Sequence, residues 1–161
     1  MLYTRTMNAA FYQKGLPFSC QRCSSCCRID PGYVFLSEED LSTLLKATGH
    51  TRNTFLKQYC RWVSIGEVQY LSLKEKEDYD CIFWEQGGCT IYPYRPIQCK
   101  SYPFWESFLE SEDQWEALKE ACPGVGKGEV HTAFEIQDWI HRRRKNPPIY
   151  RTFGQEVYSE G

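Results

Sequence analysis

The chain has 161 residues, of which 42% are hydrophobic and 25% are charged, and its formal net charge is −2 at pH 7. These values are typical of a folded globular domain, and they exclude a disordered or fibrous chain. Because the net charge is small, the chain has no general field that would favour nucleic acid or an anionic membrane surface.

Helix signals dominate the first part of the chain, after an N-terminal arm that ends near Phe18. Ser37, followed by acidic residues, is typical of a helix N-cap, and Gly49 is a stop signal, so a helix is expected between them. A second helix is expected from Thr51 to Cys60, because apolar residues recur there at helical spacing.

Strand and turn signals follow. Alternating apolar residues predict a β-hairpin over residues 62–73 and a third strand over residues 79–84. Three prolines within residues 89–105 predict an irregular segment, because proline does not fit the interior of a long helix. Helices are then expected over residues 106–121 and 129–144.

The chain shows no targeting or membrane signal. No stretch approaches the roughly 20 apolar residues of a membrane span, and the first eighteen residues hold no signal-peptide core. We therefore expect a cytoplasmic protein without a membrane partner. Cytosolic thiols are kept reduced, and the cysteine count of nine is odd, so dense cysteines indicate metal or redox chemistry rather than disulfides.

Four cysteines form the motif CQRCSSCC, from Cys20 to Cys27. Two-residue spacers let a tight loop turn successive sulfurs toward one point, as in zinc knuckles and iron–sulfur loops. Cys20, Cys23 and Cys26 are therefore expected to share one centre. Neighbouring side chains point apart in most backbone conformations, so Cys27 is expected to serve an adjacent centre or a polynuclear cluster.

Four further cysteines lie downstream beside turns or element ends: Cys81, Cys89, Cys99 and Cys122. Turns expose backbone N–H groups that can hydrogen-bond coordinated sulfur. The eight thiols divide naturally into two four-thiolate sites. Cys60 falls at an apolar position of the second expected helix, and we interpret it as a buried structural residue.

Thiolate ligands do not by themselves distinguish zinc from iron. Closed four-thiolate sites are typical of structural zinc, which would only hold the irregular loops together. The same ligands hold iron–sulfur clusters, which would add redox or organising chemistry. Disulfides or scattered free thiols are a third interpretation, and the cytoplasmic assignment argues against it.

The chain resembles the YkgJ-type cysteine-cluster proteins, a family described as a CxxCxxCC zinc- or iron-chelating domain. Three segments carry the resemblance: FSCQRCSSCCRI, DCIFWEQGGCTIYPYRPIQCKSYPF and ACPGVGKGE, within residues 18–129. The resemblance implies that eight residues bind metal: Cys20, Cys23, Cys26, Cys27, Cys81, Cys89, Cys99 and Cys122. The family loop usually has glycine where this chain has Ser24.

The family is also similar to the cysteine-rich part of flagellin lysine N-methylases, which implies an S-adenosylmethionine-linked transfer as a further activity. This chain is much shorter than such enzymes. It also has no glycine-rich strand–turn–helix that would hold a nucleoside. The reaction, if there is one, is therefore left open.

Arg95 lies four residues before Cys99, in YRPIQC. Its guanidinium would neutralise clustered thiolates or bind an anionic cofactor or substrate. A salt bridge with the acidic helix is the alternative. Nearby aromatic residues are expected to form an apolar shell over the centre: Tyr92, Tyr94, Tyr102, Phe104 and Trp105.

Other polar candidates have simpler interpretations. The basic run from His141 to Lys145 is typical of a solvated helix end that favours the helix dipole, and we prefer this to a nucleic-acid site. His50 and His131 have no partner at ligand spacing and are expected not to bind metal.

We therefore expect a small, helix-rich α+β domain with a short antiparallel sheet and an irregular cysteine-rich metal centre. The metal-binding core would span about residues 18–129 of a single domain over residues 1–161, followed by a C-terminal helix and tail over residues 129–161. The leading hypothesis is a cytoplasmic protein that holds iron, as an iron–sulfur cluster, for redox chemistry, modification, or metal and cluster transfer. The alternatives are a zinc-stapled module that binds a protein partner without catalysis, and a lysine N-methylase-like enzyme.

Overall fold

The computed structural model describes residues 10–28 and 31–153, and it divides the chain into two compact units. The first unit comprises Met1–Cys23 and Ser101–Arg142, and the second comprises Ser24–Lys100 and Arg143–Gly161. Short helices and antiparallel strand pairs confirm the α+β class. The division falls inside the CQRCSSCC motif, and the single-domain expectation remains a prediction.

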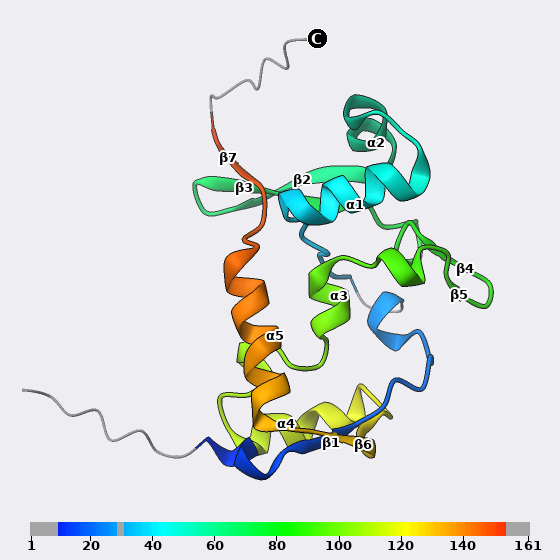
Figure 1. The fold of residues 1–161 in the computed structure, drawn as a ribbon. Helices are drawn as coiled ribbons and strands as arrows, with labels where there is room; N and C mark the ends of the chain where they lie inside the picture. The colour runs from blue at the N-terminus through cyan, green and yellow to red at the C-terminus, as the bar shows by residue number, and fades with distance from the viewer. Residues whose placement is uncertain (1–9, 29–30, 154–161) are drawn as a thin grey trace, which may run out of the picture. The chain divides into compact units, whose positions relative to one another are not determined.

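The first unit is organised around a two-stranded antiparallel sheet, β1 with β6, drawn side by side in Figure 1. The pairing of β1 with β6 places the last three residues of the N-terminal arm, Leu16–Phe18, in this unit. The elements of the unit are η1 (Phe11–Lys14), β1 (Leu16–Phe18), η4 (Glu106–Phe108), α4 (Glu112–Ala117), η5 (Leu118–Glu120), β6 (Val125–His131) and α5 (Ala133–Lys145), whose last residues belong to the second unit.

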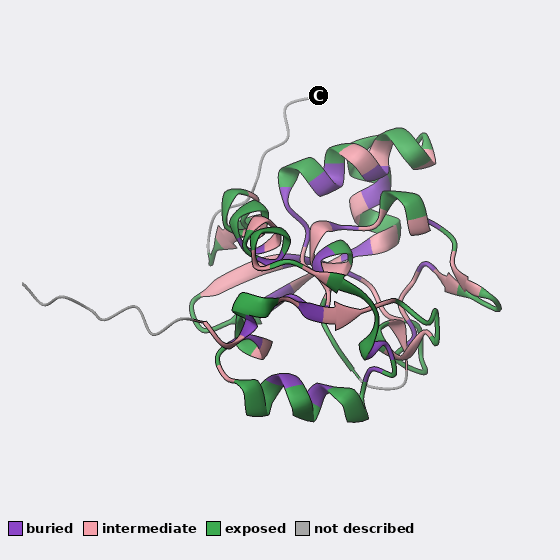
Figure 2. Ribbon diagram, turned by 60° about the horizontal axis from the view of Figure 1, so that its bottom comes forward, coloured by how far each residue is buried: buried purple, intermediate pink, exposed green. Residues whose placement is uncertain are grey.

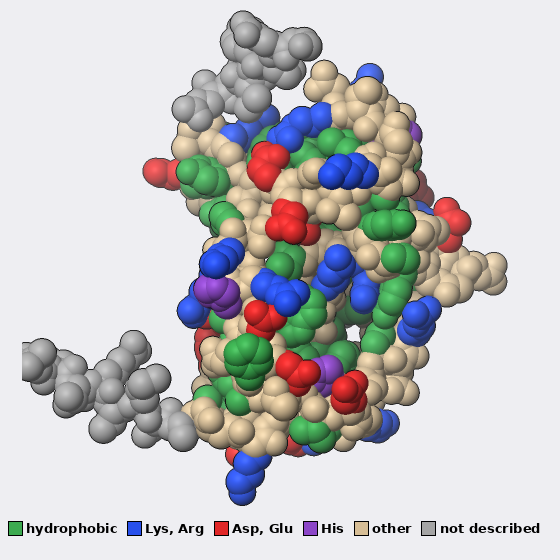
Figure 3. Space-filling view, viewed as in Figure 1, with side chains coloured by type: hydrophobic (Ala, Val, Ile, Leu, Met, Phe, Trp, Pro, Cys, Tyr) green, Lys and Arg blue, Asp and Glu red, His purple; other side chains and the backbone are tan. Residues whose placement is uncertain are grey.

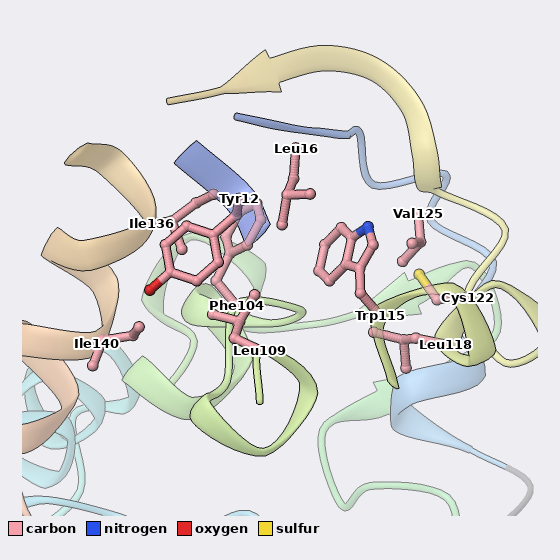
Figure 4. Close-up of a cluster of buried hydrophobic side chains, with 10 residues drawn as sticks. All are labelled: Tyr12, Leu16, Phe104, Leu109, Trp115, Leu118, Cys122, Val125, Ile136 and Ile140. Atoms are coloured by element: carbon pink, nitrogen blue, oxygen red, sulfur yellow. The ribbon is translucent and has the colours of Figure 1, made fainter. Parts of the chain in front are cut away.

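The core of the first unit is a cluster of apolar side chains drawn from both ends of its sequence. Phe104 and Trp115 stack with ring centroids 5.8 Å apart. Figure 4 shows the whole cluster: Tyr12, Leu16, Phe104, Leu109, Trp115, Leu118, Cys122, Val125, Ile136 and Ile140.

Two helix predictions in this unit were wrong in their bounds. The segment 106–121 forms three short helices, because Ser111 accepts a hydrogen bond from the backbone N–H of Gln114 at 3.3 Å and so begins a new helix. The helix expected from residue 129 begins at Ala133, because the residues up to His131 pair with β1 instead.

The second unit is built on a three-stranded antiparallel sheet in the order β2-β3-β7. Figure 1 shows α1 beside the β2–β3 hairpin, and Figure 2 shows buried and exposed positions interleaved along the short helices. The elements are η2 (Ser25–Cys27), α1 (Glu38–Thr48), α2 (Arg52–Tyr59), β2 (Cys60–Ile65), β3 (Val68–Leu73), β4 (Trp84–Glu85), β5 (Gly88–Cys89), η3 (Tyr92–Tyr94), α3 (Ile97–Ser101) and β7 (Tyr150–Thr152). The core comprises Leu36, Leu41, Leu44, Phe55, Cys60, Leu71, Leu73, Phe83 and Ile91.

The predicted helix starts of this unit are confirmed. Ser37 Oγ accepts from the backbone N–H of Asp40 at 3.1 Å, and the Asp40 carboxylate accepts from the Ser37 N–H at 3.0 Å, which completes a capping box. Gly49 ends α1 with φ of 72°, a left-handed conformation that glycine adopts easily. Thr51 caps α2, because its Oγ1 accepts a hydrogen bond from the backbone N–H of Thr54 at 3.3 Å.

The hairpin over residues 62–73 is confirmed, as the β2–β3 pair, but the third strand was predicted in the wrong place. Residues 79–84 contribute only an isolated bridge at Cys81 and the start of the β4–β5 ribbon. The third strand of the sheet is β7, in the tail. Cys60 is buried as expected, with 5% of its surface exposed, although it begins a strand rather than ending a helix.

The surface carries charges of both signs. Figure 3 shows Lys and Arg side chains interspersed with Asp and Glu on the face drawn, without an extended patch of one sign. In the part of the chain that the structure describes, no helix combines the length and apolar character needed to cross a membrane. The expectation that nucleic acid is not a partner stays a prediction.

Candidate metal centre

Five of the eight predicted ligands lie in the second unit: Cys26, Cys27, Cys81, Cys89 and Cys99. Their thiols are close enough to interact electrostatically, and Cys99 interacts with each of the other four. Cys99 is carried by α3, and Cys89 ends the β4–β5 ribbon. The fold therefore brings the second half of the CQRCSSCC motif together with three of the downstream cysteines.

Backbone conformation places the motif loop against the downstream segment. The backbone N–H of Cys27 donates to the carbonyl oxygen of Ser24 at 2.9 Å, and the N–H of Cys81 donates to the carbonyl oxygen of Cys27 at 2.8 Å. Ser24 has φ of 66°, in the left-handed region, where a side chain is disfavoured. This conformation is the physical reason for glycine at this position of the family loop.

The vicinal thiols lie together rather than apart. The Sγ atoms of Cys26 and Cys27 are 3.8 Å from each other. The expectation of diverging side chains was wrong, because the two residues belong to the tight turn of η2, and only an extended strand points successive side chains to opposite faces. Two sulfurs bound to one tetrahedral ion at about 2.3 Å lie about 3.8 Å apart, so the pair matches one edge of a tetrahedral thiolate site.

The contact between the Cys26 and Cys27 thiols shifts their pKa values in opposite directions. A hydrogen bond between the two thiols lowers the pKa of Cys26 to about 7 and raises the pKa of Cys27 well above its usual range. A thiolate is the metal-binding form of cysteine, so one member of the pair is prepared for ligation near neutral pH.

Burial raises the pKa of the Cys81, Cys89 and Cys99 thiols, because a thiolate is poorly solvated there. Backbone hydrogen bonds oppose this effect at two of them: from Phe83 to Cys81, and from Ile91 to Cys89. The donor is two residues beyond the cysteine in both cases. This confirms, for Cys81 and Cys89, the expectation that turn N–H groups would face the sulfurs.

Arg95 is the cation of this cluster. Its Nε donates to the carbonyl oxygen of Tyr92 at 2.8 Å, and its guanidinium carbon lies 3.6 Å from the centroid of the Tyr92 ring. Its positive charge acts to lower the pKa of Cys26, Cys89 and Cys99. Among the described residues Arg95 makes no ion pair with a carboxylate.

The remaining predicted ligands, Cys20, Cys23 and Cys122, belong to the first unit. Cys20 and Cys23 are exposed, and the Cys20 sulfur accepts from the backbone N–H of Arg22 at 3.4 Å. Cys122 is buried at one end of the apolar cluster, beside Val125 and Leu118 (Figure 4). Their role as ligands stays a prediction.

A finished coordination shell is not present. Within residues 10–28 and 31–153, no three His, Cys, Asp or Glu side chains stand in positions ready to hold a metal ion. The five thiols of the second unit are close enough to interact electrostatically, but no three of them are arranged around one metal-binding point. The division of eight thiols into two four-thiolate sites is therefore untested.

Sequence reasoning missed an ion pair that flanks the two cysteine segments. Arg28, which follows Cys27, donates from Nε to Asp80 Oδ1 at 3.0 Å, and Asp80 precedes Cys81. The guanidinium carbon of Arg28 also lies 3.8 Å from the centroid of the Trp84 ring. The only signal for this pair in the sequence is a charge of opposite sign beside each cysteine.

The residues predicted to form an aromatic shell have different surroundings, and both histidines contact groups other than the cysteines. Phe104 packs in the core of the first unit, and its place in a shell over the thiols stays a prediction. Tyr92 does lie beside Arg95, as part of the cluster. His50 stacks on Tyr59, and His131 Nε2 lies 2.9 Å from the carbonyl oxygen of Phe18.

A model of the CxxCxxCC family, described as "Putative zinc- or iron-chelating domain", matches residues 19–123. The chain belongs to this family. The matched range contains all eight predicted ligands of the CxxCxxCC domain, and it supports metal binding without separating zinc from iron. No solved structure matches this chain.

Proposed function

We propose that this CxxCxxCC protein is a cytoplasmic protein that holds iron, as an iron–sulfur cluster, through its cysteine thiolates. The observation that carries the proposal is the gathering of five thiols in one unit: Cys26, Cys27, Cys81, Cys89 and Cys99. Four thiolates suffice for a closed zinc site and equally for an iron–sulfur cluster, so the five thiols can supply the ligands of either. The exposed edge of the site at Cys26 is the feature that favours the iron–sulfur alternative.

The chain's own groups fit such a centre. Thiolates supply the ligands, and the backbone N–H groups that face Cys81 and Cys89 stabilise negative charge on coordinated sulfur. Arg95 adds a positive charge that offsets part of the charge of the clustered thiolates. An iron–sulfur cluster, when bound, would supply one-electron redox chemistry.

The exposure of the site favours a function in exchange over a buried metal ion that only stabilises the fold. Cys26 is exposed, whereas Cys27, Cys81, Cys89 and Cys99 are partly buried. A centre with one exposed ligand is reachable from solvent at that edge. We propose that an electron, a metal ion or a cluster is exchanged there with a protein partner.

A zinc-stapled interaction module is the second candidate, and the vicinal thiols are as compatible with it as with iron. The 3.8 Å between the Cys26 and Cys27 sulfurs matches two corners of a single tetrahedral ion. In such a module the binding free energy of zinc would serve only to stabilise the fold.

Elemental analysis of the full chain purified without oxygen separates the two candidates. The iron proposal predicts brown protein with broad visible absorbance, together with stoichiometric iron and acid-labile sulfide. Colourless protein that contains zinc and no iron or sulfide would establish the zinc module instead. Protein that holds neither metal, and takes up neither when reconstituted, would overturn metal binding altogether.

A further inference from the structure

Arg28, Asp80 and Trp84 form a cluster that joins the chain just after Cys27 to the chain on either side of Cys81. Arg28 donates a 3.0 Å hydrogen bond to Asp80, and its guanidinium carbon lies over the Trp84 ring, 3.8 Å from the ring centroid. All three residues belong to the second unit. We call this group the arginine clasp.

Two members of the arginine clasp, Asp80 and Trp84, make backbone hydrogen bonds within the Cys81 segment. The carbonyl oxygen of Asp80 accepts from the Lys76 N–H at 2.7 Å, and the Trp84 N–H donates to the carbonyl oxygen of Cys81 at 2.8 Å. The backbone at Asp80 and Trp84 is therefore hydrogen-bonded within the Cys81 segment. Arg28 contacts both of their side chains from the motif loop.

The burial of Asp80 makes the contact more than a surface ion pair. Asp80 has 8% of its surface exposed, so an unpaired carboxylate there would lose much of its hydration. The Arg52–Glu38 pair of the same unit is bidentate at 2.9 Å, but both of its side chains are largely exposed. Exposed pairs of that kind contribute little to stability, whereas a buried carboxylate strongly favours its cation.

The arginine clasp acts on the geometry of two cysteines. The Cys81 N–H already donates to the Cys27 carbonyl oxygen at 2.8 Å, and the clasp closes the same junction through side chains. A metal ion that uses thiolates from both segments needs them held at a fixed separation. The clasp thus adds side-chain contacts to a junction that the Cys81–Cys27 backbone hydrogen bond also joins.

We propose that Arg28 is a positioning residue of the metal centre, which holds the Cys27 segment against the Cys81 segment through Asp80 and Trp84. The inference rests on the proposed metal-binding function and deepens it. It assigns to Arg28 a role distinct from that of Arg95: Arg95 compensates charge at the thiols, and Arg28 fixes their spacing.

The test compares Arg28→Ala and Arg28→Lys with Arg52→Ala in the full metal-free chain, using Co²⁺ and Zn²⁺ as the probes. Affinity is measured by competition with a chelator, without oxygen. Arg28→Ala is expected to bind Co²⁺ about 10–100-fold more weakly, the usual effect of losing a group that orients a ligand. Its thiolate-to-cobalt charge-transfer absorbance per bound ion should also fall, because a thiolate no longer reaches the ion.

Arg28→Lys is expected to recover part of the affinity, because lysine keeps the pair with Asp80 but cannot lie flat on Trp84. Arg52→Ala should match the parent chain in affinity and spectrum. If Arg28→Ala does not fold, Arg28→Gln, which keeps most of the side-chain bulk, takes its place.

The outcomes separate the two proposals. A parent chain that binds neither probe overturns the proposed function itself. A parent chain that binds Co²⁺, together with an Arg28 variant of equal affinity and equal charge-transfer absorbance, overturns the role of Arg28 and leaves the proposed function standing.

Discussion

The backbone N–H of Cys81 donates a 2.8 Å hydrogen bond to the carbonyl oxygen of Cys27. This bond joins the end of the CQRCSSCC motif to the downstream cysteine segment. The boundary between the two units falls within the motif: Cys26 and Cys27 belong to the second unit with the downstream thiols Cys81, Cys89 and Cys99, and Cys20 and Cys23 belong to the first. Which of the eight thiols share a centre stays a prediction.

Metal content should depend on the clustered cysteines and not on the buried one. Cys99→Ser is expected to lower bound metal, because Cys99 interacts electrostatically with the four other thiols of its unit, and Cys23→Ser is expected to lower it as a predicted ligand. Cys60→Ser should leave metal content intact, since Cys60 lies in the apolar core and burial raises its pKa to about 12. Metal per chain, measured after anaerobic purification, checks this. Unchanged metal in both of the first two variants would refute the ligand assignment.

Removing the cation beside the thiols should weaken metal binding. Arg95→Gln is expected to reduce affinity for Zn²⁺ by about tenfold or more, because thiolate charge would lose its compensation. Arg151→Gln is the matched control: Arg151 also stacks on an aromatic ring, Trp62, and donates to Gln69 at 2.7 Å, in the same unit. Chelator competition on both variants measures the difference. Equal losses in the two would show that the effect of Arg95 is not electrostatic.

Relief of backbone strain in the motif loop should stabilise the chain. Ser24→Gly is expected to raise the free energy of unfolding of the metal-free protein by up to about 1 kcal/mol, because glycine adopts a positive φ without the Cβ penalty. Ser25→Gly should lower it, since Ser25 does not have a positive φ and glycine there only adds entropy to the unfolded chain. Denaturant titration of both variants gives the values, and a loss of stability in Ser24→Gly contradicts the strain argument.

The buried Asp40 carboxylate should support the cysteine on α3. Asp40 accepts from Ser37 and, at 2.8 Å, from the backbone N–H of Ile97, the first residue of α3. Asp40→Ala is expected to cost about 3 kcal/mol of unfolding free energy, because it leaves buried donors without an acceptor. It should also weaken metal binding, since α3 carries Cys99.

The neighbouring exposed residue provides the control for Asp40. Glu39→Ala, in the same helical turn, should change stability by about 0.5 kcal/mol or less. Denaturant titration and chelator competition measure both quantities. If Asp40→Ala loses stability while its metal affinity stays at the parent value, the link to Cys99 is wrong.

Local signals predicted the helices and the hairpin of the second unit well. The capping box at Ser37 and the stop at Gly49 depend on contacts within a few residues, so they can be read from short segments. Local sequence signals predicted the wrong secondary structure where a segment pairs with a strand that is distant in the sequence. The segment before His131 became β6 because β1 was available to pair with it, and β7 completed the sheet from a tail without a pattern.

The sequence by itself determined which side chains are available for metal: eight cysteines in a family-specific spacing, with Cys60 set apart in an apolar position. Only the tertiary structure decided which other residues these cysteines contact. It placed Cys26 and Cys27 3.8 Å apart at sulfur, joined Cys27 to Cys81, and paired Arg28 with Asp80. Spacing along a chain restricts only near neighbours, whereas contacts between distant segments depend on which turns and strand pairs the whole chain can satisfy together.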